Sequence, residues 1–451
     1  MAAKVKNMTA GDPLSLIITF SLPLMAGNIF QQMYTVVDTM VVGKALGVDA
    51  LAALGATDWL NWLVLGMVQG ITQGFAILIA RKFGAQQFEG LKKVVGSSVL
   101  LAILWGILFL ILSQLSAKPA LLLLQTPDAI LPWSLLYLRI MFAGIPIVMA
   151  YNLLACILRS LGDGQTPLTA MVIASLLNIG LDLLFVLVFG WGIAGAAIAT
   201  LIAQLVSGIF CLLRLRKIDF MTMTRDHFRP EPGMYRQLMN LGWPMAAQNA
   251  IIAIGGMIIQ TVVNGYGVVF IAGFTATNKL YGILEMAATS YGYAMITYVG
   301  QNLGAQNMDR ICKGMRAAVI VAVVTSGIIA AAMILFGKHV VGLFLSGTPQ
   351  EVDAAMAVAY EYLVVMSICL PVLYILHVTR SAVQGMGNTV LPMVSGIAEF
   401  IMRTGGVLLL PVFLGQTGIF LAEVSAWAGA DLILIPSYFI TFRQLSKQLN
   451  N

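Results

Sequence analysis

The sequence is poor in charged residues, cysteine and histidine. Asp, Glu, Lys and Arg make up only 10% of its 451 residues, whereas soluble proteins carry about 25%. The three histidines are dispersed, and no HExxH, CxxC or P-loop pattern occurs, which argues against a metalloenzyme or a nucleotide-driven pump. The four cysteines lack paired spacing, and we expect buried small hydrophobic residues rather than disulfides or metal ligands at Cys156, Cys211, Cys312 and Cys369.

Hydrophobic residues, in contrast, account for 59% of the chain and form long blocks. Each block approaches the roughly 20 residues that cross a bilayer as a helix. Asp12-Pro13 is typical of a helix start, and the apolar run behind it is too long for a signal peptide, so we expect the first helix to be retained. The sequence predicts an all-α polytopic membrane protein with twelve spans, near 14–40, 50–80, 94–116, 131–158, 167–189, 193–215, 236–263, 270–299, 314–336, 353–383, 391–413 and 418–441.

The basic residues predict how these spans are oriented. With the N-terminus inside, 19 of the 25 Lys and Arg residues, Arg380 among them, fall in or beside inner segments. Three fall in outer loops (Lys44, Lys118 and Lys338) and three within spans (Arg139, Lys279 and Arg403). This bias predicts a plasma-membrane protein with both termini in the cytoplasm. Because the basic loops explain the net positive charge, we expect no nucleic-acid partner.

The two halves of the chain resemble each other at an offset of 220 to 225 residues. "FSLPLMAGN" (20–28) aligns with "NLGWPMAAQN" (240–249), and "RSLGDGQTPL" (159–168) aligns with "QGMGNTVLPM" (384–393). Each half contains six predicted spans, so the halves are parallel repeats, an arrangement typical of alternating-access transporters. We therefore predict an N-terminal lobe at 1–216, a cytoplasmic linker at 217–235 and a C-terminal lobe at 236–451.

Polar side chains interrupt several predicted spans of the first half. Asn178 and Asp182 are four residues apart, on one face of a helix. Asp38 lies in the first span, and a carboxylate at the bilayer centre costs about 2.5–3.5 kcal/mol, which favours a functional role. Together with Asn152 and Thr200, these oxygens could hold Na⁺; alternatively, one of two adjacent carboxyl groups would bind a proton. Taken alone, Asn152 or Thr200 is better explained by an interhelical hydrogen bond.

The second half does not repeat this set, because its offsets align Asp38, Asn178 and Asp182 with Ile259, Arg403 and Val407. It carries charges of its own, with Glu399 and Arg403 spaced to pair on one helix face. Together with Glu285 they form a possible second-lobe polar site, which fits a structural ion pair and a substrate-binding role about equally well. Further charges within the membrane-spanning part of this half are Lys279, Glu423 and Asp431.

Several segments, taken in order, resemble the multidrug and toxic compound extrusion (MATE) family over nearly the whole chain. They are "VDTMVVGKALGVDALAALG" (37–55), "ARKFGAQQFE" (80–89), "LRSLGDGQTPL" (158–168), "LNIGLDLLFV" (177–186), "GIAGAAIATLIAQ" (192–204) and "GQNLGAQN" (300–307). The resemblance implies twelve helices in two six-helix lobes. It also implies export of amphiphilic, usually cationic compounds, driven by inward flow of H⁺ or Na⁺.

The resemblance also implies roles for particular residues. The cation-coupling site would consist of Asp38, Asn178, Asp182 and Thr200, which would be the metal ligands if Na⁺ is the coupling ion. Tyr34, Tyr137 and Asn152 would support that site, and Pro23 would be a hinge in the first span. The NorM-like branch has a glutamate in span seven where this chain has Ile252, so we expect a protein closer to the DinF/MepA-like side. We expect a monomer without a cofactor.

Two alternatives stay open at this point. A flippase for lipid-linked oligosaccharides or other anionic lipids is expected to line its cleft with several Lys or Arg, and only three lie within the spans. A membrane-embedded enzyme would need a metal constellation or a nucleophile–base pair, and we find neither in the sequence.

Overall fold

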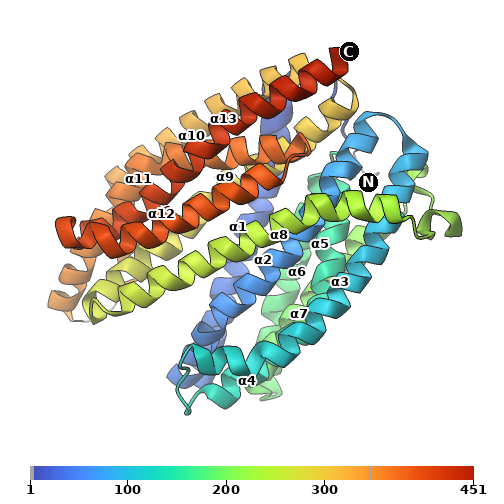
Figure 1. Cartoon of the computed structure of the whole chain (residues 1–451). Coiled ribbons are helices and arrows are strands. Elements are labelled where there is room, and N and C mark those ends of the chain that lie inside the picture. The colour runs from blue at the N-terminus through green and yellow to red at the C-terminus, as the bar shows by residue number, and fades with distance from the viewer. Residues whose placement is uncertain (1–4, 346–347, 451) are drawn as a thin grey trace. The chain divides into compact units, whose positions relative to one another are not determined.

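The computed structural model describes residues 5–345 and 348–450, which are almost entirely helical and contain no strand (Figure 1). The helices are α1 (Pro13–Leu46), α2 (Val48–Gly84), α3 (Phe88–Leu123), α4 (Leu131–Ala143), α5 (Ile145–Ser160), α6 (Gln165–Asp182) with the π-helical turn η1 (Leu183–Val188), α7 (Gly192–Leu215), α8 (Pro232–Asn264), α9 (Val268–Gly304), α10 (Met308–Gly342), α11 (Pro349–Gly385), α12 (Val390–Leu414) and α13 (Thr417–Asn450). Short 3₁₀ turns, η2 (Asp219–Met221) and η3 (Arg225–Phe228), follow α7.

These helices make twelve membrane spans, as predicted. Ten are individually long and apolar enough to cross a bilayer, and α4 and α5 together make an eleventh. The twelfth is α9, which at 37 residues is long enough to span but is richer in Gly, Ser, Thr and Tyr. Much of its C-terminal half is buried against other helices, so its polar residues lie inside the protein rather than against lipid.

Two predicted spans are not regular helices. The span predicted at 131–158 bends by 47° between α4 and α5. Gly144 stands at the bend, where the side chain of Leu201 from α7 would lie only 2.0 Å from an added Cβ, and Pro146 starts the next helix without an N–H donor. The span predicted at 167–189 changes from α-helix to π-helix directly after Asp182.

Several basic residues that the sequence assigns to loop segments lie within helices. The residues assigned to outer loops, Lys44, Lys118 and Lys338, lie within α1, α3 and α10 because these helices extend several residues beyond the apolar blocks. Arg380, counted with the inner segments, lies within α11. Its side chain is only 12% exposed and is paired with a carboxylate, so it is buried in the protein, while its assignment to the inner side of the membrane stays a prediction.

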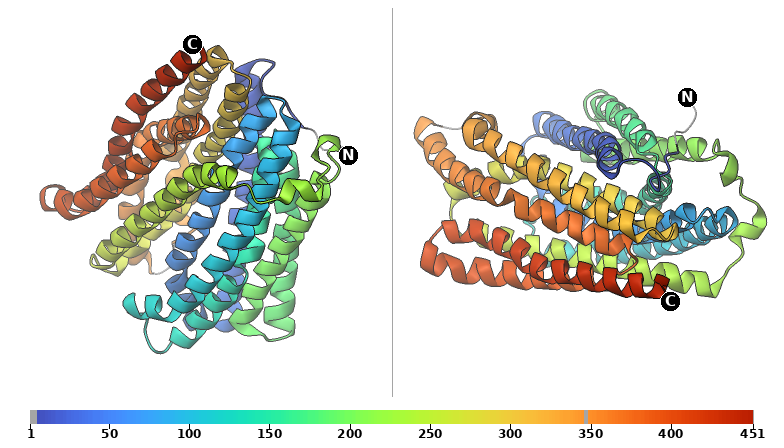
Figure 2. Two further views of the ribbon diagram at one scale, coloured as in Figure 1. Left: turned by 45° about the vertical axis from the view of Figure 1, so that its right-hand side comes forward. Right: turned by 90° about the horizontal axis from the view of Figure 1, so that it is seen from above.

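The first of two compact units comprises Leu22–Ala250 and the described residues before Thr9. In it α6 packs against α7, while α5 packs against α2, α3 and α7 (Figures 1 and 2). The N-terminal part of α8 lies against α2 so closely that a Cβ on Gly74 would be 2.3 Å from the Cα of Gly242. The segment between α7 and α8 is fastened to α3, since His227 Nε2 lies 3.1 Å from Glu89 Oε2 and the His227 carbonyl rests on Gly96.

The second unit comprises Thr9–Ser21 and Ile251–Asn451. Here α11 packs against α9, α10 and α13, and α12 packs along α13; the orange and red helices run side by side in both figures. Arg310 donates to the carbonyl of Gly11 at 2.9 Å and so ties the start of α1 to this unit. The predicted lobes, 1–216 and 236–451, were defined by the sequence repeat, whereas the two compact units are defined by which residues pack together. The lobe boundaries therefore stay a prediction.

Candidate functional site

Helices α1 and α6 bring two carboxyl groups together in the first unit. Asp38 on α1 is 6% exposed, and Asp182 at the end of α6 is fully buried. The two carboxyl groups are close enough to interact with each other, although the residues are 144 positions apart in the sequence. Asn178 lies one turn before Asp182 and is also fully buried. The predicted pairing of Asp38 with the Asn178–Asp182 face is therefore present.

Several oxygens of this group have no hydrogen-bond donor. They are Oδ1 of Asp38, both carboxyl oxygens of Asp182, and Oδ1 of Asn178. Thr200 on α7 accepts a hydrogen bond from Nδ2 of Asn178 at 3.3 Å, which turns the amide oxygen away from the hydroxyl. A buried polar group without a partner costs about 1–3 kcal/mol. A proton shared between the carboxyl groups, or a cation held by these oxygens, would supply what the protein itself does not.

The donor set matches a small hard cation better than a transition metal. It consists of two carboxyl groups, an amide oxygen and a hydroxyl, with no nitrogen or sulfur ligand. Within the described residues no group of three or more His, Cys, Asp and Glu side chains could hold a metal ion. Asp38, Asn178, Asp182 and Thr200 could hold Na⁺, and Asp38 and Asp182 alone could hold a proton.

The backbone around Asp182 is irregular. The π-helical turn η1 begins at the next residue, and its Phe185 packs against Gly195 of α7, where an added Cβ would lie 3.0 Å from the Phe185 Cβ. Wide π-turns within membrane helices are rare and concentrate at functional sites. The sequence contains no proline or glycine from 183 to 189 that would have predicted the change.

The tyrosines predicted to support the site lie beside it. Tyr137 on α4 is buried near Asp38 and Asp182 and packs against Val42 and Val186. Tyr34 lies one turn before Asp38 on α1 and interacts with it electrostatically. Both phenols are therefore placed to act on the carboxyl pair.

Asn152 and Pro23 have a less direct relation to the carboxyl groups. Asn152 donates to the carbonyl of Val148 on its own helix at 2.9 Å, the bond expected of a structural amide. Pro23 lies within α1, which continues as a helix on both sides of it. Its ring removes one backbone hydrogen bond, but its role as a hinge stays a prediction, as does the role of Asn152 in the network.

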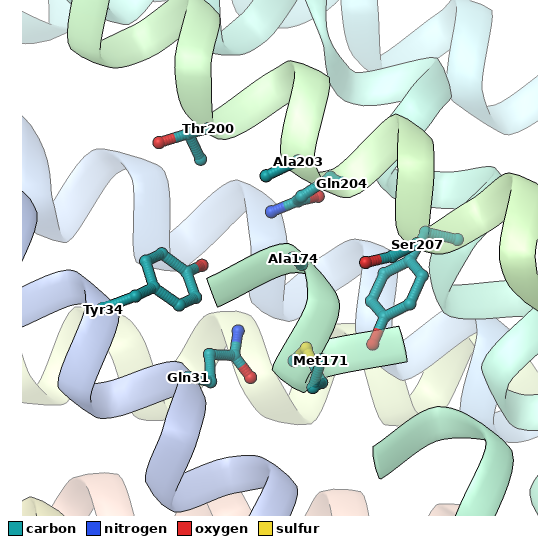
Figure 3. A pocket seen from close by; sticks show the side chains of 9 residues that line it. Gln31, Tyr34, Met171, Ala174, Thr200, Ala203, Gln204 and Ser207 are labelled. Atoms are coloured by element: carbon teal, nitrogen blue, oxygen red, sulfur yellow. The ribbon is translucent and has the colours of Figure 1, made fainter. Parts of the chain in front are cut away.

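A small polar pocket adjoins the site. Tyr34 and Gln31 reach into it from α1, and Thr200 and Gln204 reach into it from α7, with the Gln204 amide directed toward the Tyr34 hydroxyl (Figure 3). Its volume of about 20 Å³ suits one ordered water. Gln31 and Gln204 were missed in the sequence, although an amide in an apolar span, one turn from Tyr34 or Thr200, was the available signal. The complete lining is Gln31, Tyr34, Tyr151, Met171, Ala174, Thr200, Ala203, Gln204 and Ser207.

The second unit contains a chain of ion pairs across three helices. Arg403 binds Glu399 one turn before it on α12 at 3.0 Å, so the pair expected from the i,i+4 spacing is present. Arg380 on α11 binds the other oxygen of Glu399 at 2.6 Å, and Arg403 also binds Glu423 on α13 at 3.0 Å. Glu285 on α9 lies outside this chain and faces His377, with 3.5 Å between Oε1 and Nε2.

A helical bundle of twelve spans, with carboxyl groups buried between its helices, is the architecture of a membrane transport protein. Comparison with known proteins identifies which kind. The MatE family model matches residues 23–184 and 244–405, two segments 221 residues apart, which confirms the internal repeat. The chain belongs to this family of multi-pass membrane transporters, and it is a transport protein rather than an enzyme.

Individual relatives agree with this placement. The chain is similar to the "Probable multidrug resistance protein YpnP" of Bacillus subtilis, at 31% identity over 92% of each chain. It is 22% identical to the "Multidrug export protein MepA" of Staphylococcus saprophyticus over 91% of this chain and 88% of that one, and 24% identical to the "Probable multidrug resistance protein NorM" of Thermotoga maritima over 92% and 89%. Because MepA and NorM are about equally distant, the expected branch stays a prediction.

The fold is likewise shared with solved structures. A crystal structure of "MATE in the bent conformation" superposes with a TM-score of 0.90 at 23% identity, covering all of both chains. The twelve helices in two repeated halves predicted for this protein are thus confirmed.

Proposed function

We propose that this transporter exports amphiphilic, cationic small molecules from the cell in exchange for H⁺ or Na⁺, by alternating access. Export of several drugs is suggested by the names of its relatives, multidrug resistance and multidrug export proteins. The observation that carries the exchange is the set of buried oxygens on Asp38, Asn178 and Asp182 that lack donors. A cation that completes this site binds more tightly to conformations in which the site is formed than to conformations in which it is not. Binding of the cation therefore shifts the equilibrium between these conformations.

In this proposal both termini face the cytoplasm, and the coupling cation enters from outside. When Asp38 and Asp182 take up a proton or Na⁺, the negative charge of the first unit falls and a cationic substrate is bound less tightly. Release of the cation inside restores the charge and the substrate affinity. Tyr34, Tyr137 and the Asn178–Thr200 hydrogen bond position the oxygens for this exchange.

Dye efflux from proteoliposomes tests the proposal, with a proton gradient and a sodium gradient imposed separately. We expect one gradient to drive efflux of a cationic dye such as ethidium, and Asp38→Asn and Asp182→Asn each to abolish that efflux while the protein stays folded. Asp353→Asn, a change at an exposed residue on α11, is the matched control. Retained ion-driven efflux in both site variants would show that the coupling site lies elsewhere.

A lipid flippase is less well supported. An anionic headgroup needs several accessible cationic side chains, but Arg403 and Arg380 are each held by carboxylates and largely buried. Of the cationic residues predicted within the spans, Arg139 and Lys279 are exposed. Translocation of a labelled anionic lipid headgroup at a rate above that of empty vesicles, without dye efflux, would favour the flippase instead.

A further inference from the structure

The ion-paired helices of the second unit hold more negative than positive charge. The cluster formed around these ion pairs has four carboxyl groups (Glu285, Glu399, Glu423 and Asp431) and two guanidinium groups (Arg380 and Arg403). Lys279, on the same helix as Glu285, is exposed and forms no ion pair among the described residues. The neighbouring segments of α10 (317–337) and α8 (251–264) contain no charged residue, so they add no charge to the cluster. With every carboxyl group ionised, the cluster would carry two uncompensated negative charges.

The geometry shows which carboxyl groups lack compensation. Both oxygens of Glu399 bind arginines, and Glu423 binds Arg403. Asp431 on α13 is 7% exposed, and its Oδ1 has no hydrogen-bond partner. Arg380 and Glu399 are the charged groups that act on Asp431. Nε of Arg380 is also buried and has no hydrogen-bond partner. Asp431 therefore accepts no hydrogen bond from this nearby N–H group.

The second uncompensated carboxyl group is that of Glu285. His377 Nδ1 lies 3.0 Å from the carbonyl of Leu373, which can only accept, so Nδ1 carries a hydrogen. In a neutral ring Nε2 then bears the lone pair, and it lies 3.5 Å from Oε1 of Glu285. Two acceptors that face each other repel unless a proton lies between them. Arg380 lies one turn after His377 on α11, and like charges one turn apart on a helix repel each other, so the proton belongs on Glu285.

We propose that the second unit contains a proton-binding site of its own, formed by Glu285 with His377 and by Asp431, separate from the Asp38–Asp182 pair. Each carboxylate takes one proton from hydronium in the surrounding solvent, which leaves a water molecule, and becomes a neutral carboxylic acid; the charge of the cluster is then zero. Glu285 exposes about a third of its side chain, whereas Asp431 is buried, so Glu285 is the group that meets solvent first.

The charged and titratable groups around this site come from four helices. Glu285 is acted on by Glu399, Glu423, Arg403 and Arg380, and it lies close to the phenols of Tyr281 and Tyr374. The arginines are already paired with Glu399 and Glu423, so they do not replace the two missing positive charges. The site does not depend on the proposed coupling role of Asp38 and Asp182.

Infrared difference spectroscopy on the full-length protein in lipid vesicles tests this inference, because a protonated carboxyl group has its own C=O stretching band. Spectra at about pH 6 minus spectra at about pH 10 are recorded in sodium-free buffer for the double variant Asp38→Asn/Asp182→Asn, which lacks the buried carboxyl pair of α1 and α6. Exposed carboxyl groups, whose ordinary pKa is about 4, stay ionised at both pH values and do not contribute to the band. We expect a carboxylic acid band to remain in this background, and Glu285→Gln or Asp431→Asn each to remove about half of it, since each removes one of two acids. Asp353→Asn should leave the band unchanged.

Three results would overturn the inference. These are the absence of a band in the double variant, a band unaffected by both substitutions, and a band that disappears when sodium chloride is added. Because a substitution at Asp431 could disturb folding, His377→Gln provides a second test, as it keeps every carboxyl group but should shift the Glu285 part of the band. The difference between wild type and the double variant reports separately on the Asp38–Asp182 pair, so failure of one proposal is distinguishable from failure of the other.

Discussion

Replacing Asp182 by asparagine should stabilise the protein and at the same time abolish its coupling to an ion gradient. In the wild type both Asp182 oxygens and Oδ1 of Asp38 are buried without a donor. The asparagine has the same shape, and its NH₂ group supplies a donor toward Asp38. One hydrogen bond to a charged group contributes about 1.5–3 kcal/mol, and that is the stabilisation we expect.

The gain should depend on pH in a defined direction. It should be largest in alkaline solution, where the wild-type pair holds no proton and its two negative charges repel each other. It should shrink in acid, where a proton shared by the two carboxyl groups supplies the same donor in the wild type. Thermal unfolding in detergent, followed by circular dichroism at several pH values, measures it. For a protein above about 250 residues the corresponding rise in melting temperature is a few degrees.

Proteoliposome efflux by the same variant completes the test. A melting temperature below that of wild type at every pH, together with retained ion-driven efflux, would refute the reasoning, since it would mean that the Asp182 carboxylate is already satisfied by the protein. Asp353→Asn, on the surface of α11, controls for the loss of a negative charge and should change neither property.

Two further predictions concern backbone contacts. Gly144→Ala should destabilise the protein by about 1–3 kcal/mol, because the added Cβ would lie 2.0 Å from the Leu201 side chain. In thermal unfolding, the double variant Gly144→Ala/Leu201→Ala should lose less stability than the sum of the losses in the two single variants. An additive loss would contradict the contact. Gly96→Ala should loosen the segment between α7 and α8, because the added Cβ would lie 2.0 Å from the His227 carbonyl oxygen. Limited proteolysis should therefore cut this variant within 217–231 faster than the control Gly90→Ala, whose Cβ would make an ordinary 3.5 Å contact. Equal cleavage rates in the two variants would contradict this prediction.

Much of the fold could be predicted because the membrane imposes simple rules on sequence. An uninterrupted apolar block of about 20 residues has few structures available in a bilayer, and every predicted span corresponds to a helix or a helix pair. The helix ends were less predictable, since α3 and α10 continue through polar residues that lie beyond the apolar block. The bend at Gly144 depends on a side chain from α7, and no local pattern contains that information.

Part of the candidate site could also be predicted, because the membrane restricts which side chains a span can contain. A carboxylate in an apolar span is rare and therefore informative, so Asp38 and Asp182 stood out, whereas an amide is cheaper to bury, and Gln31 and Gln204 did not. Arg380 was grouped with the inner segments because basic residues near the end of a span usually face water, and the sequence did not indicate that it is buried. Its partner, Glu399, lies on a different helix, and only the packing of α11 against α12 and α13 shows that the guanidinium is ion-paired.

The two repeats place buried carboxyl groups in chemically different surroundings. The sequence offset puts Arg403 where the first half has Asn178 and Val407 where it has Asp182. In the second unit arginines therefore neutralise Glu399 and Glu423, and among the described residues of the cluster Glu285 and Asp431 are left without compensation. Among the described residues of the first unit no arginine or lysine forms an ion pair with Asp38 or Asp182, so the charge of this site depends on whether it binds a cation. A cation-dependent change of conformation should consequently be larger in the first unit, because a bound ligand shifts an equilibrium only by its differential free energy of binding to the two states.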